Sequence, residues 1–114
     1  MRIWVRTMIG KIVTVTVDRP MGTYHPDYKE LYYPVNYGYI KGILAADGEE
    51  QDAYILGVDD PVKEFVGKVI AIIHRLNDVE DKWIVVPEDL MMTKEEILKQ
   101  IYFQEKYFKV NIIM

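Results

Sequence analysis

The 114-residue chain contains no cysteine. This absence excludes disulfide bonds, thiolate zinc sites and a cysteine nucleophile, and it is compatible with a reducing cytosol. Apolar runs long enough to cross a membrane are also missing. Arg6 and Lys11 interrupt the apolar N-terminal stretch, and no small-residue cleavage site follows it, so we expect no signal peptide. We therefore expect a soluble, cytoplasmic protein without a membrane partner.

An excess of positive charge is lacking as well. The chain has 14 Lys and Arg against 18 Asp and Glu, which gives a formal net charge of −4. A nucleic-acid backbone requires clustered Lys and Arg, so we expect no nucleic-acid partner. A small anionic substrate remains compatible with this charge if metal ions bridge it to carboxylates. The length and the 50% hydrophobic content indicate one domain over residues 1–114.

The first half of the chain contains two strand patterns and an irregular segment. Residues 11–17 alternate β-branched side chains with a period of two, which predicts a strand. Residues 2–8 are expected to form its partner strand, with a turn at Gly10. Residues 18–34 are rich in proline, which predicts a long irregular segment of the kind that often carries function.

The remaining strands are predicted from apolar runs and turn signals. Residues 35–42 and 52–57 are expected to form strands joined across the Asp47-Gly48 turn, because Asp-Gly favours hairpins. Residues 68–74 and 83–86 indicate two buried strands with a short acidic turn between them.

The C-terminal region changes to a helical period. Thr93 and Glu96 form a capping-box pattern, and an apolar stripe continues to about Lys109. Five or six short strands followed by one helix predict a mostly β protein of the α+β type. We expect a small, closed or partly closed β-barrel with a helix packed on it.

Two acidic clusters are the strongest chemical signal. The first has four carboxylates in six positions, Asp47-Gly48-Glu49-Glu50-Gln51-Asp52, and the second is Asp78-Val79-Glu80-Asp81. Each cluster alone is typical of a solvated turn. Carboxylates that face one another need a cation, and ligands that are all oxygen suit Mg²⁺, with Mn²⁺ as the alternative. Since both clusters lie at strand ends, together they indicate a metal site for phosphate chemistry.

Basic and aromatic candidates lie around these clusters. Lys82 follows the second cluster directly, where an ammonium could neutralise a phosphoryl oxygen. Arg19 and His25 lie in or next to the irregular segment. Asn36 lies in the middle of an aromatic stretch, where one use of a buried amide is to orient a metal-binding carboxylate.

The order of these motifs resembles the family I soluble inorganic pyrophosphatases. The motifs are Tyr-Pro-x-Asn-Tyr-Gly-Tyr from Tyr33, Asp-Gly-x-x-x-Asp from Asp47, and an acidic turn followed by Lys82 and a strand ending at Pro87. The resemblance covers residues 33–87 well and the C-terminal helix more loosely. It implies a five-stranded OB-like barrel with a C-terminal helix, Mg²⁺-dependent hydrolysis of pyrophosphate to two phosphates, and a homo-oligomer.

The resemblance also implies roles for individual residues. Its metal ligands fall on Asp47, Asp52, Glu80 and Asp78. The base that accepts a proton from the attacking water falls on Glu49. The substrate contacts fall on Tyr37, Lys82 and Tyr107, to which the irregular segment adds Arg19 and His25 as a further cationic set.

The chain departs from the family pattern at several of these positions. Glu49 and Glu80 stand where the family has Asp, and a misplacement near 1 Å can cost on the order of 100-fold in rate. Phe108 replaces a family Lys, and the N-terminal half is shorter, so its family Lys, Glu and Arg have no unique counterparts. Two alternatives therefore remain open: a hydrolase for a nucleotide-type phosphoanhydride, and a catalytically weak phosphate-binding module.

Overall fold

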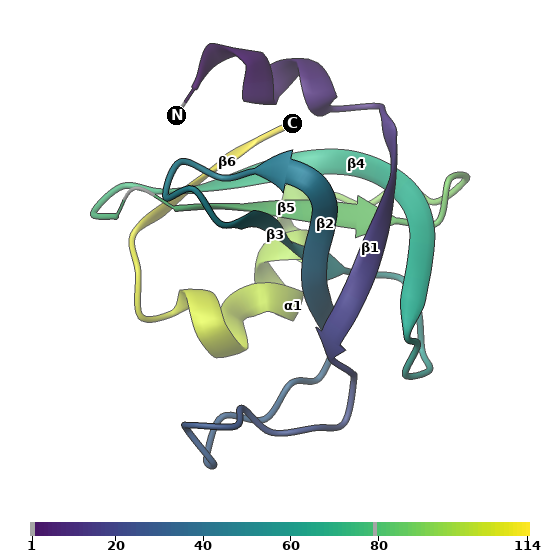
Figure 1. The fold of residues 1–114 in the computed structure, drawn as a ribbon, viewed down its shortest axis with the longest axis vertical. Helices are drawn as coiled ribbons and strands as arrows, with labels where there is room; N and C mark the ends of the chain where they lie inside the picture. The colour runs from purple at the N-terminus through teal and green to yellow at the C-terminus, as the bar shows by residue number, and fades with distance from the viewer. Residues whose placement is uncertain (1, 79) are drawn as a thin grey trace.

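The computed structural model describes residues 2–78 and 80–114, and a closed five-stranded barrel forms its centre (Figure 1). The strands are β1 (Ile12–Arg19), β2 (Asn36–Leu44), β3 (Glu50–Ile55), β4 (Glu64–Arg75) and β5 (Asp81–Val86). They pair in the order β1-β2-β3-β5-β4, and β1 also pairs with β4, which closes the barrel. The β3–β5 pairing is parallel, and the other barrel pairings are antiparallel. The predicted OB-like, mostly β barrel is confirmed.

Side-chain alternation divides the barrel strands between two hydrophobic clusters. On β5, Trp83 and Val85 belong to the cluster inside the barrel, whereas Ile84 and Val86 belong to the cluster beneath the C-terminal helix. Successive side chains of a strand point to opposite faces, so β2, β3, β4 and β5 each contribute to both clusters, whereas β1 contributes only to the inner one. The outer cluster matters for the site, because every second residue of β2, β3, β4 and β5 faces the same side.

The N-terminal segment is not the predicted strand. Ile3–Met8 form a 3₁₀ helix, η1, which lies across one end of the barrel (Figure 1). Val5 is fully buried there and packs into the inner cluster. A strand over residues 2–8 would need a free edge of β1, but β1 already pairs with β2 on one side and β4 on the other. Val5 instead covers this end of the inner cluster, and the partly buried Met8 and Ile9 pack beside it.

Helix α1 (Lys94–Glu105) begins at the predicted capping box. The Glu96 N–H donates to Thr93 Oγ1 at 3.2 Å, and the Thr93 N–H donates to Glu96 Oε1 at 3.0 Å. The helix ends at Glu105 rather than near Lys109. Val110–Ile113 form strand β6, which pairs antiparallel with β4. The β-branched side chains of this stretch favour a strand. Its partner is the C-terminal part of β4, Ile72–Arg75, which lies beyond the residues that pair with β1.

The irregular segment is confirmed, and Asn36 anchors its end. The Oδ1 atom of Asn36 accepts hydrogen bonds from the N–H groups of Met21 at 2.9 Å and Val62 at 3.2 Å, and its Nδ2 donates to the Asp60 carbonyl at 2.9 Å. Asn36 is fully buried, so these bonds satisfy a side chain that water does not reach. Asn36 therefore joins two loops instead of orienting a metal-binding carboxylate.

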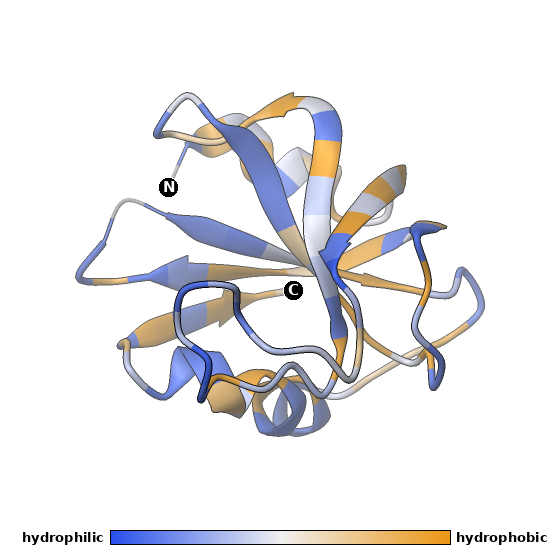
Figure 2. Cartoon of the chain, turned by 60° about the horizontal axis from the view of Figure 1, so that its bottom comes forward, coloured by the Kyte–Doolittle hydropathy of each residue, from blue (hydrophilic) through white to orange (hydrophobic). Residues whose placement is uncertain are grey.

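Hydrophilic and hydrophobic residues are interspersed along the chain. Figure 2 shows both kinds along the barrel strands and hydrophilic stretches in the loops around them. Within the described part of the chain, no helix is long and apolar enough to cross a membrane.

The capping box gives the first testable prediction. Replacement of Thr93 by Ala removes the side-chain acceptor of the Glu96 N–H and should lower the free energy of unfolding by about 1 kcal/mol. Urea unfolding measures this change. Thr93→Ser keeps a hydroxyl at the cap and should retain most of the stability, so an equal loss in both variants would show that the cap contributes nothing.

Candidate functional site

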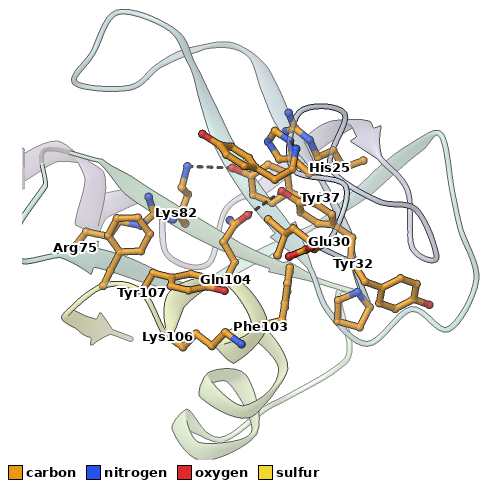
Figure 3. Close-up of a pocket in the computed structure, with 16 residues that line it drawn as sticks. His25, Glu30, Tyr32, Tyr37, Arg75, Lys82, Phe103, Gln104, Lys106 and Tyr107 are labelled. Carbon is orange, nitrogen blue, oxygen red and sulfur yellow. Dashed lines mark hydrogen bonds between the residues drawn. The ribbon is translucent and has the colours of Figure 1, made fainter.

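A pocket of about 760 Å³ lies where the outer barrel face, the loop after β1 and the end of α1 meet (Figure 3). Its lining combines aromatic rings with cationic side chains. The lining residues are Arg19, His25, Tyr28, Glu30, Leu31, Tyr32, Tyr33, Pro34, Tyr37, Arg75, Lys82, Phe103, Gln104, Lys106, Tyr107 and Phe108. These residues come from segments far apart in the sequence, so only the folded chain assembles this surface.

Strand alternation explains why the polar side chains of the barrel gather at this pocket. Because Trp83 points into the barrel, its neighbour Lys82 points to the side of α1. Ile73 and Tyr54 belong to the outer cluster. Arg75 and Asp52 each lie two positions from one of them on the same strand, so they face the same side. One face of the barrel therefore presents a carboxylate, an ammonium and a guanidinium.

Lys82 lies at the centre of this polar group. Its Nζ contacts Asp52 Oδ2 at 2.6 Å and Glu80 Oε2 at 3.1 Å, and it donates to the Tyr37 hydroxyl at 3.0 Å. The side chain is only 4% exposed. Burial alone would lower the pKa of Lys82, but Tyr37 and Asp52 outweigh it and raise the pKa above its ordinary value. Lys82 is therefore a fixed positive charge.

A second ion pair joins the end of α1 to the barrel. Arg75 donates from Nε to Glu105 Oε1 at 2.9 Å and from Nη2 to Glu105 Oε2 at 2.7 Å, and its Nη1 contacts Glu80 at 3.1 Å. Its guanidinium carbon lies 3.7 Å from the centre of the Phe108 ring. Arg75 and Glu105 are both buried. Buried charges of this kind are tolerated only when each is paired, so the two residues fix one another.

Three further side chains extend this pairing. The Tyr54 hydroxyl donates to Glu105 Oε2 at 2.6 Å and accepts from Gln104 Nε2 at 2.6 Å. The Tyr33 hydroxyl donates to Gln104 Oε1 at 2.8 Å. The floor of the pocket is thus a continuous hydrogen-bonded network between α1, the strands and the loop after β1.

Glu105 was not among the predicted site residues, although the sequence carries a signal for it. Ile97, Ile101 and Glu105 follow one another at four-residue spacing and are all buried on one face of α1. A carboxylate on an apolar helical stripe indicates a buried cationic partner. Tyr54 and Gln104 gave no comparable signal, because a Tyr in a strand and a Gln on a helix are common.

The predicted metal ligands occupy different places. Asp52 and Glu80 converge on Lys82 and are partly exposed. Asp47 and Glu49 are exposed at the β2–β3 hairpin tip, where Asp47 Oδ1 accepts the Glu49 N–H at 3.0 Å. Asp78 is exposed in the turn before β5. In residues 2–78 and 80–114, no group of three or more His, Asp or Glu is placed to hold one metal ion.

Asp52 and Glu80 nevertheless fit one mode of metal binding. Mg²⁺ in phosphate sites is usually held by one or two carboxylates together with water and substrate oxygens, rather than by a cage of protein ligands. The two carboxylates are oxygen donors that converge on the ammonium of Lys82, which lines the pocket. They could therefore hold Mg²⁺ jointly with a phosphate substrate.

The predicted substrate-binding residues do share the pocket. Arg19, His25, Tyr37, Lys82 and Tyr107 all line it. The guanidinium carbon of Arg19 lies 5.8 Å from the centre of the Tyr33 ring and 5.9 Å from that of Tyr37. Its buried Nε has no hydrogen-bond partner among the described residues. Arg19 is therefore a cation with one N–H group that has no acceptor among the described residues. The roles of the five residues in substrate binding stay predictions.

His25 is held in one orientation by its own loop. Its Nδ1 accepts hydrogen bonds from the N–H groups of Asp27 at 3.0 Å and Tyr28 at 3.2 Å. The hydrogen of the neutral ring therefore resides on Nε2, which is the atom available to donate to a ligand.

The buried tyrosines predict how stability depends on pH. Burial raises the pKa of Tyr37 above its ordinary value of 10.0, and Lys82 opposes this only in part; burial and Glu105 raise the pKa of Tyr54 in the same direction. Above about pH 10 the unfolded chain releases these protons while the folded chain keeps them, so the free energy of unfolding falls as pH rises.

Urea unfolding midpoints at pH 8 and pH 11 measure this loss. We expect Tyr37→Phe to flatten the decline and the exposed Tyr102→Phe to leave it as it is. The same decline in both variants would rule out a contribution from Tyr37.

Comparison with solved structures shows a shared architecture. The chain is similar to an inorganic pyrophosphatase from Neisseria gonorrhoeae, with a TM-score of 0.66 and 21% identity over 86% of this chain and 74% of that one. It is also similar to the inorganic pyrophosphatases of Ehrlichia chaffeensis (TM-score 0.67, 16% identity, 90% of this chain and 85% of that one) and Helicobacter pylori (TM-score 0.62, 18% identity, 90% and 82%). No family model and no curated protein matches the chain. The chain therefore has the fold of the inorganic pyrophosphatases.

Proposed function

We propose that the protein hydrolyses inorganic pyrophosphate to two phosphates and that it needs Mg²⁺, or alternatively Mn²⁺, to do so. The observation that carries this proposal is the position of Lys82. Its buried ammonium lies between Asp52, Glu80 and the Tyr37 hydroxyl, at the inner end of a pocket that Arg19 also lines. Such a site presents positive charge to an anion next to carboxylates that suit a hard cation. The shared fold supports the same substrate class.

The proposed metal ligands are Asp52 and Glu80, with Asp47 and Asp78 as further ligands. When bound, a divalent ion would supply positive charge to the phosphates and lower the pKa of a bound water. Asp52 and Glu80 would meet a metal–phosphate complex beside Lys82, where both carboxylates are partly exposed.

The remaining roles belong to side chains of the pocket and the hairpin. Arg19 would donate hydrogen bonds to phosphoryl oxygens, because its Nε is without a partner among the described residues. Lys82 and Tyr37 would stabilise charge on the phosphate that leaves, and His25 Nε2 and Tyr107 would hold its other end. Glu49 would accept the proton of the attacking water.

The proposal includes a setting for this activity. We expect a cytoplasmic homo-oligomer that takes a small phosphate anion and binds neither nucleic acid nor membrane. Light scattering of the purified protein measures the oligomeric state directly.

A second candidate function rests on a specific observation. The two carboxylates that would hold the metal are already neutralised, Asp52 by Lys82 and Glu80 by Lys82 and Arg75. A metal ion would have to compete with these internal cations. If it competes poorly, the protein would bind phosphate anions without hydrolysing them.

Phosphate release from pyrophosphate in the presence of Mg²⁺ tests the first proposal. Asp52→Asn should lower the rate at least about 100-fold, because the amide replaces a charged group at the site of charge development. Asp89→Asn changes an exposed carboxylate far from the pocket lining and should not affect the rate. Equal rates in the two variants would contradict the role of Asp52.

Calorimetric titration separates the two candidates. Pyrophosphate binding together with phosphate release supports the hydrolase. Binding without release under any divalent metal identifies the binding module and overturns the hydrolase.

A further inference from the structure

The pocket is larger and more aromatic than an inorganic anion requires. Its volume of about 760 Å³ is typical of sites for organic ligands. Seven Tyr and Phe rings line it, together with the imidazole of His25. Inorganic pyrophosphate has no apolar face to pack on such rings, so the proposed phosphate chemistry leaves most of this surface unused.

The lining is divided between an inner cationic part and an outer aromatic part. Lys82 and Arg75 are buried at the barrel, and Arg19 lies beside Tyr33 and Tyr37. Farther out, Tyr28 is 69% exposed and Tyr107 is 68% exposed. Figure 3 shows Tyr107 and Lys106 on the helix side of the pocket, and His25 and Tyr32 on the loop side. A ligand that filled both parts would be anionic at one end and planar at the other.

Exposed rings on two walls can cover such a planar group. Tyr28 stands on the loop beside His25, with ring centres 4.9 Å apart, and Tyr107 follows the end of α1. Aromatic side chains stack on any nucleobase, because every base has a π face. Covering the rings would also remove apolar surface from water.

Glu30 supplies the third observation. It is an exposed carboxylate among the residues that line the pocket. A carboxylate repels phosphate but accepts hydrogen bonds from hydroxyl and amino groups. Its presence at the aromatic part suits a sugar or a base, which inorganic pyrophosphate lacks.

We propose that this site also takes a phosphoanhydride with a nucleoside attached, of the nucleoside diphosphate class, and binds it more tightly than inorganic pyrophosphate. Its phosphates lie at Arg19 and Lys82, and its base stacks between the walls that carry Tyr28 and Tyr107. This inference rests on the proposed function for the phosphate end. Hydrolysis joins the water oxygen to the terminal phosphorus as the bridging P–O bond breaks; the bridging oxygen stays with the nucleoside monophosphate, and the proton passes to Glu49.

Calorimetric titration in Mg²⁺ with ADP, inorganic pyrophosphate and adenosine tests this inference. We expect ADP to bind at least about 10-fold more tightly than pyrophosphate, which is within the contribution of one base–aromatic stack. Tyr28→Ala should remove most of that advantage and leave pyrophosphate binding as it is, because Tyr28 lines the outer part of the pocket and has no proposed role at the phosphates. Tyr28→Phe keeps the ring and should keep the advantage.

Tyr102→Ala is the matched control, because Tyr102 is 64% exposed on α1 and does not line the pocket. ADP binding no tighter than pyrophosphate binding, or an equal effect of Tyr28→Ala on both ligands, overturns the inference. Phosphate release measured in parallel keeps the two proposals apart. Release from pyrophosphate without an ADP advantage supports only the proposed function, and an ADP advantage without release from either ligand supports only the aromatic site.

Discussion

The buried ammonium of Lys82 is the contact on which the rest of the site depends. A charge with 4% exposure is stable only if its partners replace the lost water. Those partners come from β2, β3 and the turn before β5, in the form of Tyr37, Asp52 and Glu80. The requirement to satisfy one ammonium therefore fixes the relative positions of these segments on the outer face of the barrel.

The ion pair between Arg75 and Glu105 fixes the position of the helix relative to the barrel. It ties the last turn of α1 to the end of β4, and Tyr54 and Gln104 extend it toward the loop after β1. All walls of the pocket are thus connected through one network of charges and hydroxyls. Glu80 contacts both Lys82 and Arg75, so a cation that drew Glu80 away would affect both halves of the network.

One departure from the pyrophosphatase pattern replaces a cationic side chain of the site with an aromatic one. Phe108 stands where the resembling family has Lys, and its ring packs on the Arg75 guanidinium. Arg19 lines the pocket with a buried Nε that has no hydrogen-bond partner among the described residues. The site has fewer mobile cations and more rings than an inorganic anion alone would favour. This is the physical ground for a ligand with an organic part.

Features that depend on residues a few positions apart along the chain follow from the sequence alone. The alternation in residues 11–17, the Asp47-Gly48 turn and the Thr93 capping box involve contacts within a few positions. Motif order also led to the barrel and to some of the residues in and beside the pocket. Asp52, Lys82 and Tyr37 were found in this way.

The structure of the N-terminal segment, the last strand and the ion pairs depends on partners distant along the chain. Local sequence patterns therefore do not specify these features. The N-terminal segment forms a 3₁₀ helix because both edges of β1 are paired, and β6 pairs with the C-terminal part of β4, which β1 leaves unpaired. Strand alternation brought Asp52 to Lys82 and left Asp47 at an exposed tip. The Arg75–Glu105 pair spans 30 residues. No local pattern encodes such a distance, since sheet pairing and ion pairing are set by how the whole barrel closes.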